Sequence, residues 1–209
     1  MKNHIVKKKI GRPRSDHKPL LTQSAISLFL EKGFHQTRIE DIIHKAEIGK
    51  GTFYLYFQNK EQLVLDALQS LALELRETFD WVHMEMPEES NLEELFHKEA
   101  LKIVSTLEKN QELARFLFKE GRSVGQEIDQ QLNQYYLSIV EQAENTYALG
   151  MHMGILERGD PRVSAMCVLG SVLQVFHYYL EGQLKLETKE IAKLVTQFCL
   201  RGLGLKSMT

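Results

Sequence analysis

The chain has 209 residues, 43% of them hydrophobic and 26% charged, with a formal net charge of −2. Such a chain can bury a sizeable core in one or two domains, as a soluble globular protein does. No uninterrupted apolar run approaches the roughly 18 residues that span a bilayer, and no apolar segment follows the basic N-terminus. We therefore expect a cytoplasmic protein without a membrane partner.

The charge is distributed unevenly along the chain. Residues 1–62 hold 12 Lys and Arg against 6 Asp and Glu, a net charge of +6, which leaves −8 for the remainder. A basic first third attached to an acidic body favours oriented docking on nucleic acid through phosphate contacts. On charge alone, a merely solvated basic tail is an equal alternative.

Residues 1–17 form a basic arm, in which Gly11 and Pro13 interrupt any helix. We expect this arm to be disordered in the free protein. The piece G-R-P-R that ends at Arg14 is similar to the short core of an AT-hook, whose arginines suit the narrow minor groove of A·T-rich DNA. Arg12 and Arg14 are thus candidate DNA contacts, by minor-groove insertion or by general attraction to phosphates.

The next two predicted helices lie on either side of Gly33. The first begins near Pro19 and ends at Gly33, with an apolar stripe of Leu21, Ala25, Leu28 and Phe29. The second begins at Thr37, which has the spacing of a capping box with Glu40. Its apolar face follows the helical repeat at Ile39, Ile42, Ile43 and Ala46.

A third, short helix is predicted at residues 50–57, after a turn at residues 47–49. Phe53 and Phe57 are one turn apart and face inward, which leaves hydroxyls, a cation and flat rings on the other sides. Two short helices joined by a tight turn are typical of a helix-turn-helix, whose second helix enters the DNA major groove.

The run G-T-F-Y-x-Y-F at residues 51–57, followed by N-K-E at 59–61 and by Leu63, resembles the TetR (tetracycline-repressor) family over residues 19–71. The resemblance implies an all-α fold: a three-helix N-terminal helix-turn-helix domain joined to a C-terminal helical bundle. It also implies a ligand site for a small, often apolar molecule, and dimerisation through the last two helices. The positions at which the resemblance implies DNA contacts are Thr37, Lys50, Gly51, Thr52, Tyr54, Tyr56 and Lys60.

The chemistry of these side chains agrees with those roles. Lys50, Tyr54, Tyr56 and Lys60 carry groups suited to phosphate oxygens, and Thr37 adds the N–H groups of a helix N-terminus. Base reading should fall to Lys50 at guanine, and to Thr52 and Leu55 at thymine methyl groups. For either tyrosine, packing within the domain is the alternative.

Two positions depart from the usual family pattern. Glu47 stands where members commonly have the turn glycine, and a non-glycine residue in a left-handed turn costs on the order of 1 kcal/mol. Gly49 replaces the usual serine, which removes a side-chain cap and a phosphate contact. Neither change removes the fold.

The remaining chain indicates further helices, about nine in total, and no strand. Asn59 caps a long helix with an apolar stripe from Leu63 to Phe79, which joins the two halves. Later helices are predicted to end near Asn110, Gly121 and Gly150, another to run from Asp160-Pro161 to Gly182, and the last to begin with Thr188 as its cap. The domains are therefore an arm at 1–17, a DNA-binding domain at 18–62, and a ligand-sensing and dimerisation domain at 63–209.

The ligand site has many candidates, and packing in the core is the alternative for each aromatic or methionine. They are Phe79, Trp81, Met84, Phe96, Phe116, Phe118, Arg122, Tyr135, Tyr136, Tyr147, Met151 and His177. Arg122 is expected to pair with Glu120 or Glu127 at the surface rather than with a ligand. Histidines lack metal-ligand spacing, so no metal or cofactor is expected, and Cys167 and Cys199 are expected to be reduced core thiols.

The last two helices are apolar around much of their circumference, so they need cover on more than one side. A second copy of the chain would supply it, with an interface formed by Met166, Leu169, Val172, Leu173, Phe176, Leu194 and Phe198. The alternative is that both helices are central in a monomer.

The sequence therefore predicts a TetR-like homodimeric repressor that binds a palindromic operator in double-stranded DNA and is released by a small, apolar effector. The alternatives are a ligand-independent or architectural DNA-binding regulator, a small-molecule carrier, or an enzyme. No nucleophile motif, phosphate-cradling loop or H-E-x-x-H stands in the sequence, so we do not expect an enzyme.

Overall fold

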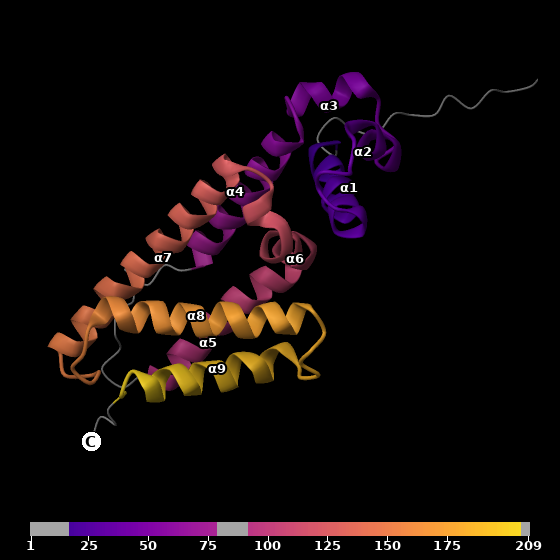
Figure 1. Cartoon of the computed structure of the whole chain (residues 1–209). Helices are drawn as coiled ribbons and strands as arrows, with labels where there is room; N and C mark the ends of the chain where they lie inside the picture. The colour runs from indigo at the N-terminus through magenta and orange to yellow at the C-terminus, as the bar shows by residue number, and fades with distance from the viewer. Residues whose placement is uncertain (1–16, 79–91, 206–209) are drawn as a thin grey trace, which may run out of the picture. The chain divides into compact units, whose positions relative to one another are not determined.

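The structure is a computed structural model that describes residues 17–78 and 92–205 (Figure 1). Over those ranges the chain forms α-helices and one 3-10 turn, with no strand, which confirms the predicted all-α class. The helices are α1 (His17–Lys32), α2 (Ile39–Lys45), α3 (Lys50–Tyr56), α4 (Lys60–Thr78), α5 (Leu92–Lys109), α6 (Gln111–Glu120), α7 (Gln126–His152), α8 (Pro161–Leu180) and α9 (Thr188–Gly202), and the 3-10 turn η3 (Gly121–Ser123) lies between α6 and α7.

The chain divides into two compact units between Val64 and Leu65, a point that lies inside α4. In the first unit, α1, α2 and α3 pack on one another. Their core is aromatic: the rings of Phe29 and Phe34 meet edge to face with centroids 5.0 Å apart, and Phe53 and Phe57 lie 5.8 Å apart. Edge-to-face packing of this kind stabilises a domain too small to bury much aliphatic surface.

The helix ends in the first unit follow local chemistry. Gly33 has a φ of 90°, which a glycine adopts without strain, and it ends α1 as predicted. The Asn59 side chain accepts a hydrogen bond from the Gln62 N–H at 2.7 Å, so the predicted cap of α4 is confirmed. The predicted capping box of α2 is wrong, because α2 begins at Ile39 and the Arg38 N–H donates to Asp41 Oδ2 at 2.9 Å.

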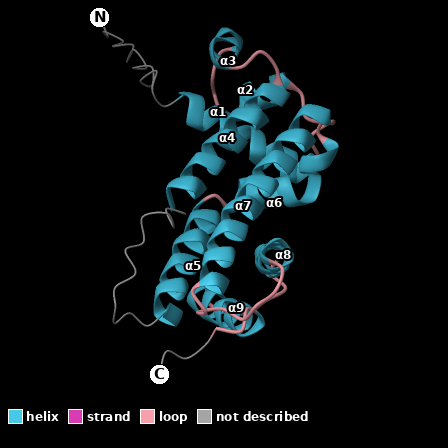
Figure 2. Cartoon of the chain, turned by 90° about the vertical axis from the view of Figure 1, so that its left-hand side faces the viewer, coloured by secondary structure: helices cyan, strands magenta, loops and turns pink. Residues whose placement is uncertain are grey.

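In the second unit, α7 packs along α8 and α5 packs along α9, while α8 and α9 lie side by side (Figures 1 and 2). Two apolar clusters hold these helices together. One is centred on Val104, Leu107, Ala114, Phe176 and Ala192, and the other on Val140, Tyr147, Leu156, Ala165 and Leu203. The bundle predicted for this part of the chain is thus confirmed.

The last two helices begin differently from each other. Asp160 caps α8 as predicted, because its side chain accepts from the Val163 N–H at 2.8 Å. Thr188 does not cap α9: the capping position is Glu187, and the Thr188 hydroxyl donates to Glu108 Oε1 instead. A long-range polar contact therefore replaces the local cap that the sequence predicted.

α8 is an unusually apolar helix. Among the described residues it alone is long and apolar enough to cross a membrane by length and composition, although Arg162, Gln174 and His177 interrupt its apolar run. Ala165 and Phe176 are its buried residues, and its exposed residues, among them Val163, Met166 and Gly170, lie along one side of the helix. That side of α8 is thus left open by its own chain.

Candidate nucleic-acid interface

The second short helix, α3, is held in place from one side only. Phe53 is fully buried and is tilted against Phe57, which follows the last residue of the helix. The opposite side is open, with Tyr54 50% exposed and Leu55 76% exposed. Its exposure leaves the Leu55 side chain accessible to thymine methyl groups, and the base contact of Leu55 stays a prediction.

The other predicted contacts on α3 are distributed around this open side. Gly51 is exposed and its Cβ position is empty within 4 Å, so DNA backbone could approach it closely. Thr52 and Tyr56 are half-buried. The ring of Tyr56 lies 6.3 Å from that of Phe57, so it contributes to packing as well as to the outer surface.

The turn between α2 and α3 is set by Glu47, which has a φ of 55° and is the only non-glycine residue with a positive φ in the described ranges. The Glu47 N–H donates to His44 O at 3.1 Å and the Ile48 N–H to Ile43 O at 2.9 Å. This pair of bonds is the Schellman motif that ends many helices, normally with glycine at the left-handed position. The sequence prediction of a left-handed glutamate here is confirmed.

Gly49 occupies the position before α3 and has no side chain to cap it. Its carbonyl accepts the Thr52 N–H at 2.9 Å, which is the first bond of the helix. A Cβ at Gly49 would meet nothing within 4 Å, so a serine would fit here. The expectation that this position lacks a side-chain cap is therefore confirmed.

Lys50 does not stand alone at the start of α3. Its Nζ donates to Glu40 Oε1 of α2 at 2.8 Å, and both side chains are about 60% exposed. The hydrogen bond lowers the pKa of the Glu40 carboxyl, and the same bond raises the pKa of Lys50. The sequence had assigned Glu40 to helix capping, so this ion pair was missed.

Two of the predicted contact residues are turned inward. Thr37 is only 1% exposed, its hydroxyl donates to Gly33 O at 2.8 Å and its N–H to Phe34 O at 3.2 Å. Thr37 is also outside α2, so the prediction that it offers free N–H groups at a helix N-terminus was wrong. Its role in the structure is to fix the connection between α1 and α2.

Lys60 belongs to the same connection. Its Nζ donates to Phe34 O at 2.6 Å and to Thr37 O at 3.0 Å, and lies 4.2 Å from the centre of the Phe34 ring. Burial lowers the pKa of this ammonium. The phosphate contact of Lys60 stays a prediction, but its hydrogen bonds are a structural role that the sequence did not indicate. Arg12 and Arg14 lie outside the described residues.

The candidates for a ligand site are spread over the second unit. Phe79, Trp81 and Met84 lie outside the described residues. Phe116 is fully buried, while Phe118 is partly exposed and its ring lies 5.2 Å from that of His177. Phe96, Tyr135, Tyr136 and Met151 are half-buried.

Two members of this set have clear structural roles. Burial in the cluster with Leu156 and Leu203 raises the pKa of the Tyr147 hydroxyl well above its usual value, so Tyr147 acts as a core residue. Arg122 is exposed and pairs with Asp129 at 3.2 Å. The expected surface pair of Arg122 is thus present, but with Asp129 rather than with Glu120 or Glu127.

The predicted interface on α8 and α9 is largely turned outward. Met166, Leu194 and Phe198 are exposed, and Leu169, Val172 and Leu173 are half-buried. Phe176 was assigned wrongly, because it is 2% exposed and belongs to the core cluster with Val104 and Leu107.

The sequence prediction missed several members of this surface. Val163, Cys167, Gly170 and Tyr178 are also exposed and, together with Met166 and the polar Gln174, lie along one side of α8 at spacings of three and four. This spacing could have identified the exposed side of α8 from the sequence. It did not, because the opposite side of α8 is apolar too. Cys167 is consequently exposed and not a core thiol, whereas Cys199 is buried as expected.

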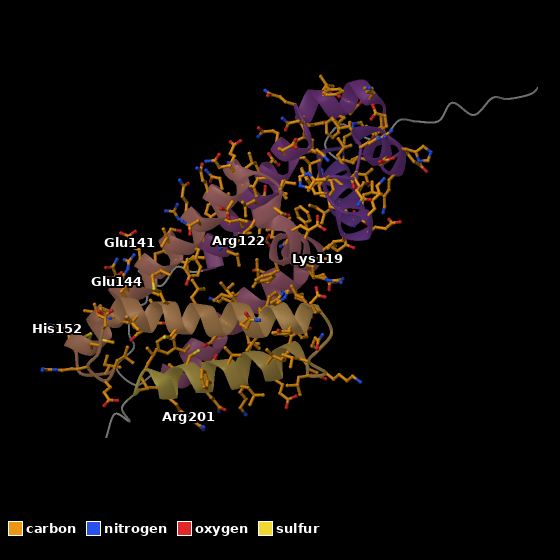
Figure 3. The ribbon with its side chains drawn as sticks, in the orientation of Figure 1. Lys119, Arg122, Glu141, Glu144, His152 and Arg201 are labelled. Carbon is orange, nitrogen blue, oxygen red and sulfur yellow. The ribbon has the colours of Figure 1, made fainter. Side chains whose placement is uncertain are left out.

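α7 exposes both apolar residues, such as Leu137 and Leu149, and charged residues. Glu141, Glu144 and His152 follow one another toward its C-terminal end (Figure 3), and Glu144 pairs with Arg162 at 3.0 Å. No group of three or more His, Cys, Asp or Glu side chains in the described ranges could hold a metal ion.

An N-terminal helix-turn-helix with an open second helix, attached to an all-helical second unit, defines a DNA-binding transcriptional regulator. Residues 21–67 match the model of the family described as bacterial regulatory proteins, tetR family. The match covers the DNA-binding part of the chain, so residues 21–67 form a DNA-binding domain of the TetR type.

Similarity extends over the length of the chain. The fatty acid metabolism regulator protein of Bacillus subtilis is 26% identical over 192 residues, which are 89% of this chain and 95% of that protein. FadR from Bacillus subtilis in complex with stearoyl-CoA has a similar fold, with a TM-score of 0.69 at 20% identity over 88% of this chain and 98% of that one. NalD, the secondary repressor of the MexAB-OprM multidrug efflux pump in Pseudomonas aeruginosa, has a TM-score of 0.73 at 21% identity over 92% and 98%.

Proposed function

We propose that this regulator is a repressor that binds a palindromic operator as a homodimer and leaves it when a small apolar effector binds in the second unit. Residues 1–17 serve as a basic arm, 18–62 as the DNA-binding domain and 63–209 as the effector-binding and dimerisation domain. The observation that carries this proposal is the exposed apolar surface of α8 and α9.

That surface runs along both helices. On α8 it consists of Val163, Met166, Cys167, Gly170 and Tyr178, and on α9 of Leu194 and Phe198, which is 68% exposed. An apolar surface of this extent on a soluble protein marks an interaction site. Because two-fold dimers are the commonest oligomers, the favoured occupant is the same surface of a second copy.

A dimer would explain how a short helix such as α3 can select one site in a genome. A single helix-turn-helix contacts few base pairs, whereas two of them, held about 34 Å apart, read two half-sites on one side of the duplex. The free-energy costs of mismatches in the two half-sites then add, so the dimer is more selective than a single helix-turn-helix. The N-terminal basic charge adds affinity for any DNA and brings the protein to it.

The effector is proposed to be apolar on two grounds. Phe118 is exposed and Phe96, Tyr135, Tyr136 and Met151 are half-buried, so the second unit has aromatic and thioether surface that its own core does not use fully. FadR, which shares the fold, is known in complex with stearoyl-CoA, a molecule with a long apolar chain. A long acyl chain is therefore the first class of effector to test.

Release from the operator would pass through α4. This helix begins at Lys60, whose ammonium holds the α1–α2 connection, and continues to Thr78 in the second unit. There Glu74 accepts from Lys109 Nζ at 2.6 Å and from Asn110 Nδ2 at 3.0 Å, which ties α4 to the end of α5. An effector that binds one conformation of the second unit more tightly than another shifts the population toward the tightly binding conformation. The size of this shift is limited by the ratio of the effector's affinities for the two conformations.

The test begins with recovery of the operator: genomic fragments retained by the purified protein are sequenced, and the recovered site is used in gel shifts at fixed salt. Long-chain acyl-CoA thioesters, free fatty acids and apolar drugs are then added. We expect a palindromic site and its release by one of these classes. A site that is retained with all of them would favour a ligand-independent regulator, and a non-palindromic footprint with DNA bending would favour an architectural one.

A further inference from the structure

We propose that Glu40 is a specificity-determining residue, and that Glu40 and Lys50 together read one G·C base pair in each half-site. The proposal rests on α3 as the DNA-reading helix. Its starting point is the 2.8 Å bond from Lys50 Nζ to Glu40 Oε1, which joins the first turn of α2 to the first residue of α3.

Glu40 is not needed for the helix-capping role that the sequence predicts for it. A carboxylate in the first turn of a helix normally stabilises the free N–H groups there. In α2 that role belongs to Asp41, which accepts from the Arg38 N–H at 2.9 Å and from Lys32 Nζ at 2.6 Å. Both interactions lower the pKa of the Asp41 carboxyl. Glu40 is therefore left with Lys50 as its partner.

The bond between Glu40 and Lys50 also contributes little as a stabilising ion pair. Both side chains are about 60% exposed, and exposed pairs are weakened by solvent and by salt. A carboxylate beside the reading helix would moreover repel phosphates. Glu40 thus weakens binding to DNA in general and adds little to the stability of the fold. Its presence is explained if it favours one DNA sequence over others.

The chemistry of the pair matches one base pair. In the major groove a G·C pair presents the O6 and N7 acceptors of guanine next to the N4 amino donor of cytosine. A lysine ammonium is a donor and a glutamate is an acceptor, and here the two are already held side by side. On the operator, Lys50 donates to guanine and Glu40 accepts from cytosine, so the ammonium keeps an acceptor and the carboxylate keeps a donor.

Other base pairs do not offer this exchange in the same order. An A·T pair presents its amino donor between two acceptors, whereas a G·C pair presents two acceptors followed by a donor, so the arrangement of Lys50 and Glu40 that fits G·C does not fit A·T. On an A·T pair Lys50 therefore stays bonded to Glu40 and is withheld from the phosphates, while Glu40 gains no contact with the bases. Loss of its carboxylate should therefore strengthen non-specific binding and weaken selectivity in one step.

The test uses the full-length protein and a library of random-sequence duplexes, so no operator need be known beforehand. Sites selected by the wild type and by Glu40→Gln are compared, and affinities for the best site and for random DNA are measured against salt. The matched control is Glu31→Gln, because Glu31 also forms an exposed ion pair in this unit, with Lys45 at 3.7 Å.

We expect the wild type to require a G·C pair at one position of each half-site. In Glu40→Gln that preference should fall roughly tenfold, within the range that a single base contact supplies. Binding to random DNA should rise several-fold, with a salt slope steeper by about 1 because Lys50 is freed for a phosphate. Glu31→Gln should leave all three quantities unchanged.

Failure of this proposal can be distinguished from failure of the assigned reading helix. Tyr54→Ala and Leu55→Ala test the helix itself, and undiminished affinity in both would overturn α3 as the reading element. If both variants bind weakly but Glu40→Gln keeps the wild-type base preference, the reading helix stands and the role of Glu40 is overturned. If Glu40→Gln raises the affinity equally for all DNA sequences, Glu40 only repels the phosphates, and this result would also overturn the proposal.

Discussion

The Tyr179 hydroxyl of α8 donates to Glu108 Oε1 of α5 at 3.1 Å, and both groups also meet the Thr188 hydroxyl at the start of α9 at 2.9 Å. The three side chains thus close a small polar ring that joins three helices. Glu108 is followed directly by Lys109 and Asn110, which hold Glu74 of α4. The end of α5 therefore connects the proposed dimer helices to the helix that leads into the DNA-binding unit.

Removal of the Tyr179 hydroxyl by Tyr179→Phe should lower the free energy of unfolding by about 1 kcal/mol, the usual effect of losing a partly buried hydrogen bond. It should also reduce the effect of an effector on operator affinity, because α8 and α9 would no longer be tied to α5 through Glu108. Urea unfolding and gel shifts with and without effector measure the two effects. Ser138→Ala is the control, since it removes an exposed hydroxyl that donates to Tyr135 O within α7, and an equal effect of both variants would remove the role given to the ring.

The left-handed turn at Glu47 leads to a stability prediction. Glycine adopts a φ of 55° without the cost of about 1 kcal/mol that an L side chain incurs, although its greater freedom in the unfolded chain offsets part of the gain. Glu47→Gly should therefore raise the free energy of unfolding by up to about 1 kcal/mol, and Glu47→Val should lower it, because β-branched residues tolerate this conformation poorly. Glu47→Gln separates charge from conformation and should be nearly neutral. If the glycine and valine variants are equally stable, the turn does not carry strain.

The turn at Glu47 also shows what the sequence could and could not predict. The turn, the inward Phe53 and the caps at Asn59 and Asp160 depend on residues a few positions apart, and the structure confirms them. Apart from the capping box of α2, which is displaced by one residue, the errors concern contacts between distant residues, which spacing does not encode.

Three such long-range contacts account for most of the errors in individual assignments. Thr188 bonds to Glu108, 80 residues away, instead of capping α9, and Lys60 bonds to the carbonyl of Phe34. Phe176 turns to Val104 rather than outward, because a helix that is apolar on all sides does not reveal which side faces its own core.

Lys60 is predicted to matter more for folding than for DNA affinity. Lys60→Met keeps the stem but leaves the carbonyls of Phe34 and Thr37 without their ammonium donor, which should cost roughly 1–3 kcal/mol. The ammonium of Lys60 already has hydrogen-bond partners within the protein. The slope of log K against log salt for operator binding should therefore change by less than the value of about 1 that one phosphate contact contributes. Urea unfolding and salt titration measure these effects, and Lys45→Met is a comparison at an exposed site. Unchanged stability with a salt slope lower by about 1 would restore the phosphate contact as the main role of Lys60.

Gly170 provides the sharpest test of the proposed dimer. It lies on the exposed side of α8, and a Cβ there would meet nothing within 4 Å, so a larger residue has room within the single chain. Leucine is moreover a better helix former than glycine by roughly 0.8 kcal/mol, which should stabilise an isolated α8. If α8 packs closely against its counterpart in a second copy, Gly170→Leu should separate the two chains and give the 24.2 kDa mass of a monomer by light scattering. Phe198→Glu should do the same through charge, and Leu149→Glu, at an exposed leucine of α7, should not. A wild type that is itself monomeric, or a Gly170→Leu variant that keeps the dimer mass, would mean that this surface serves another partner.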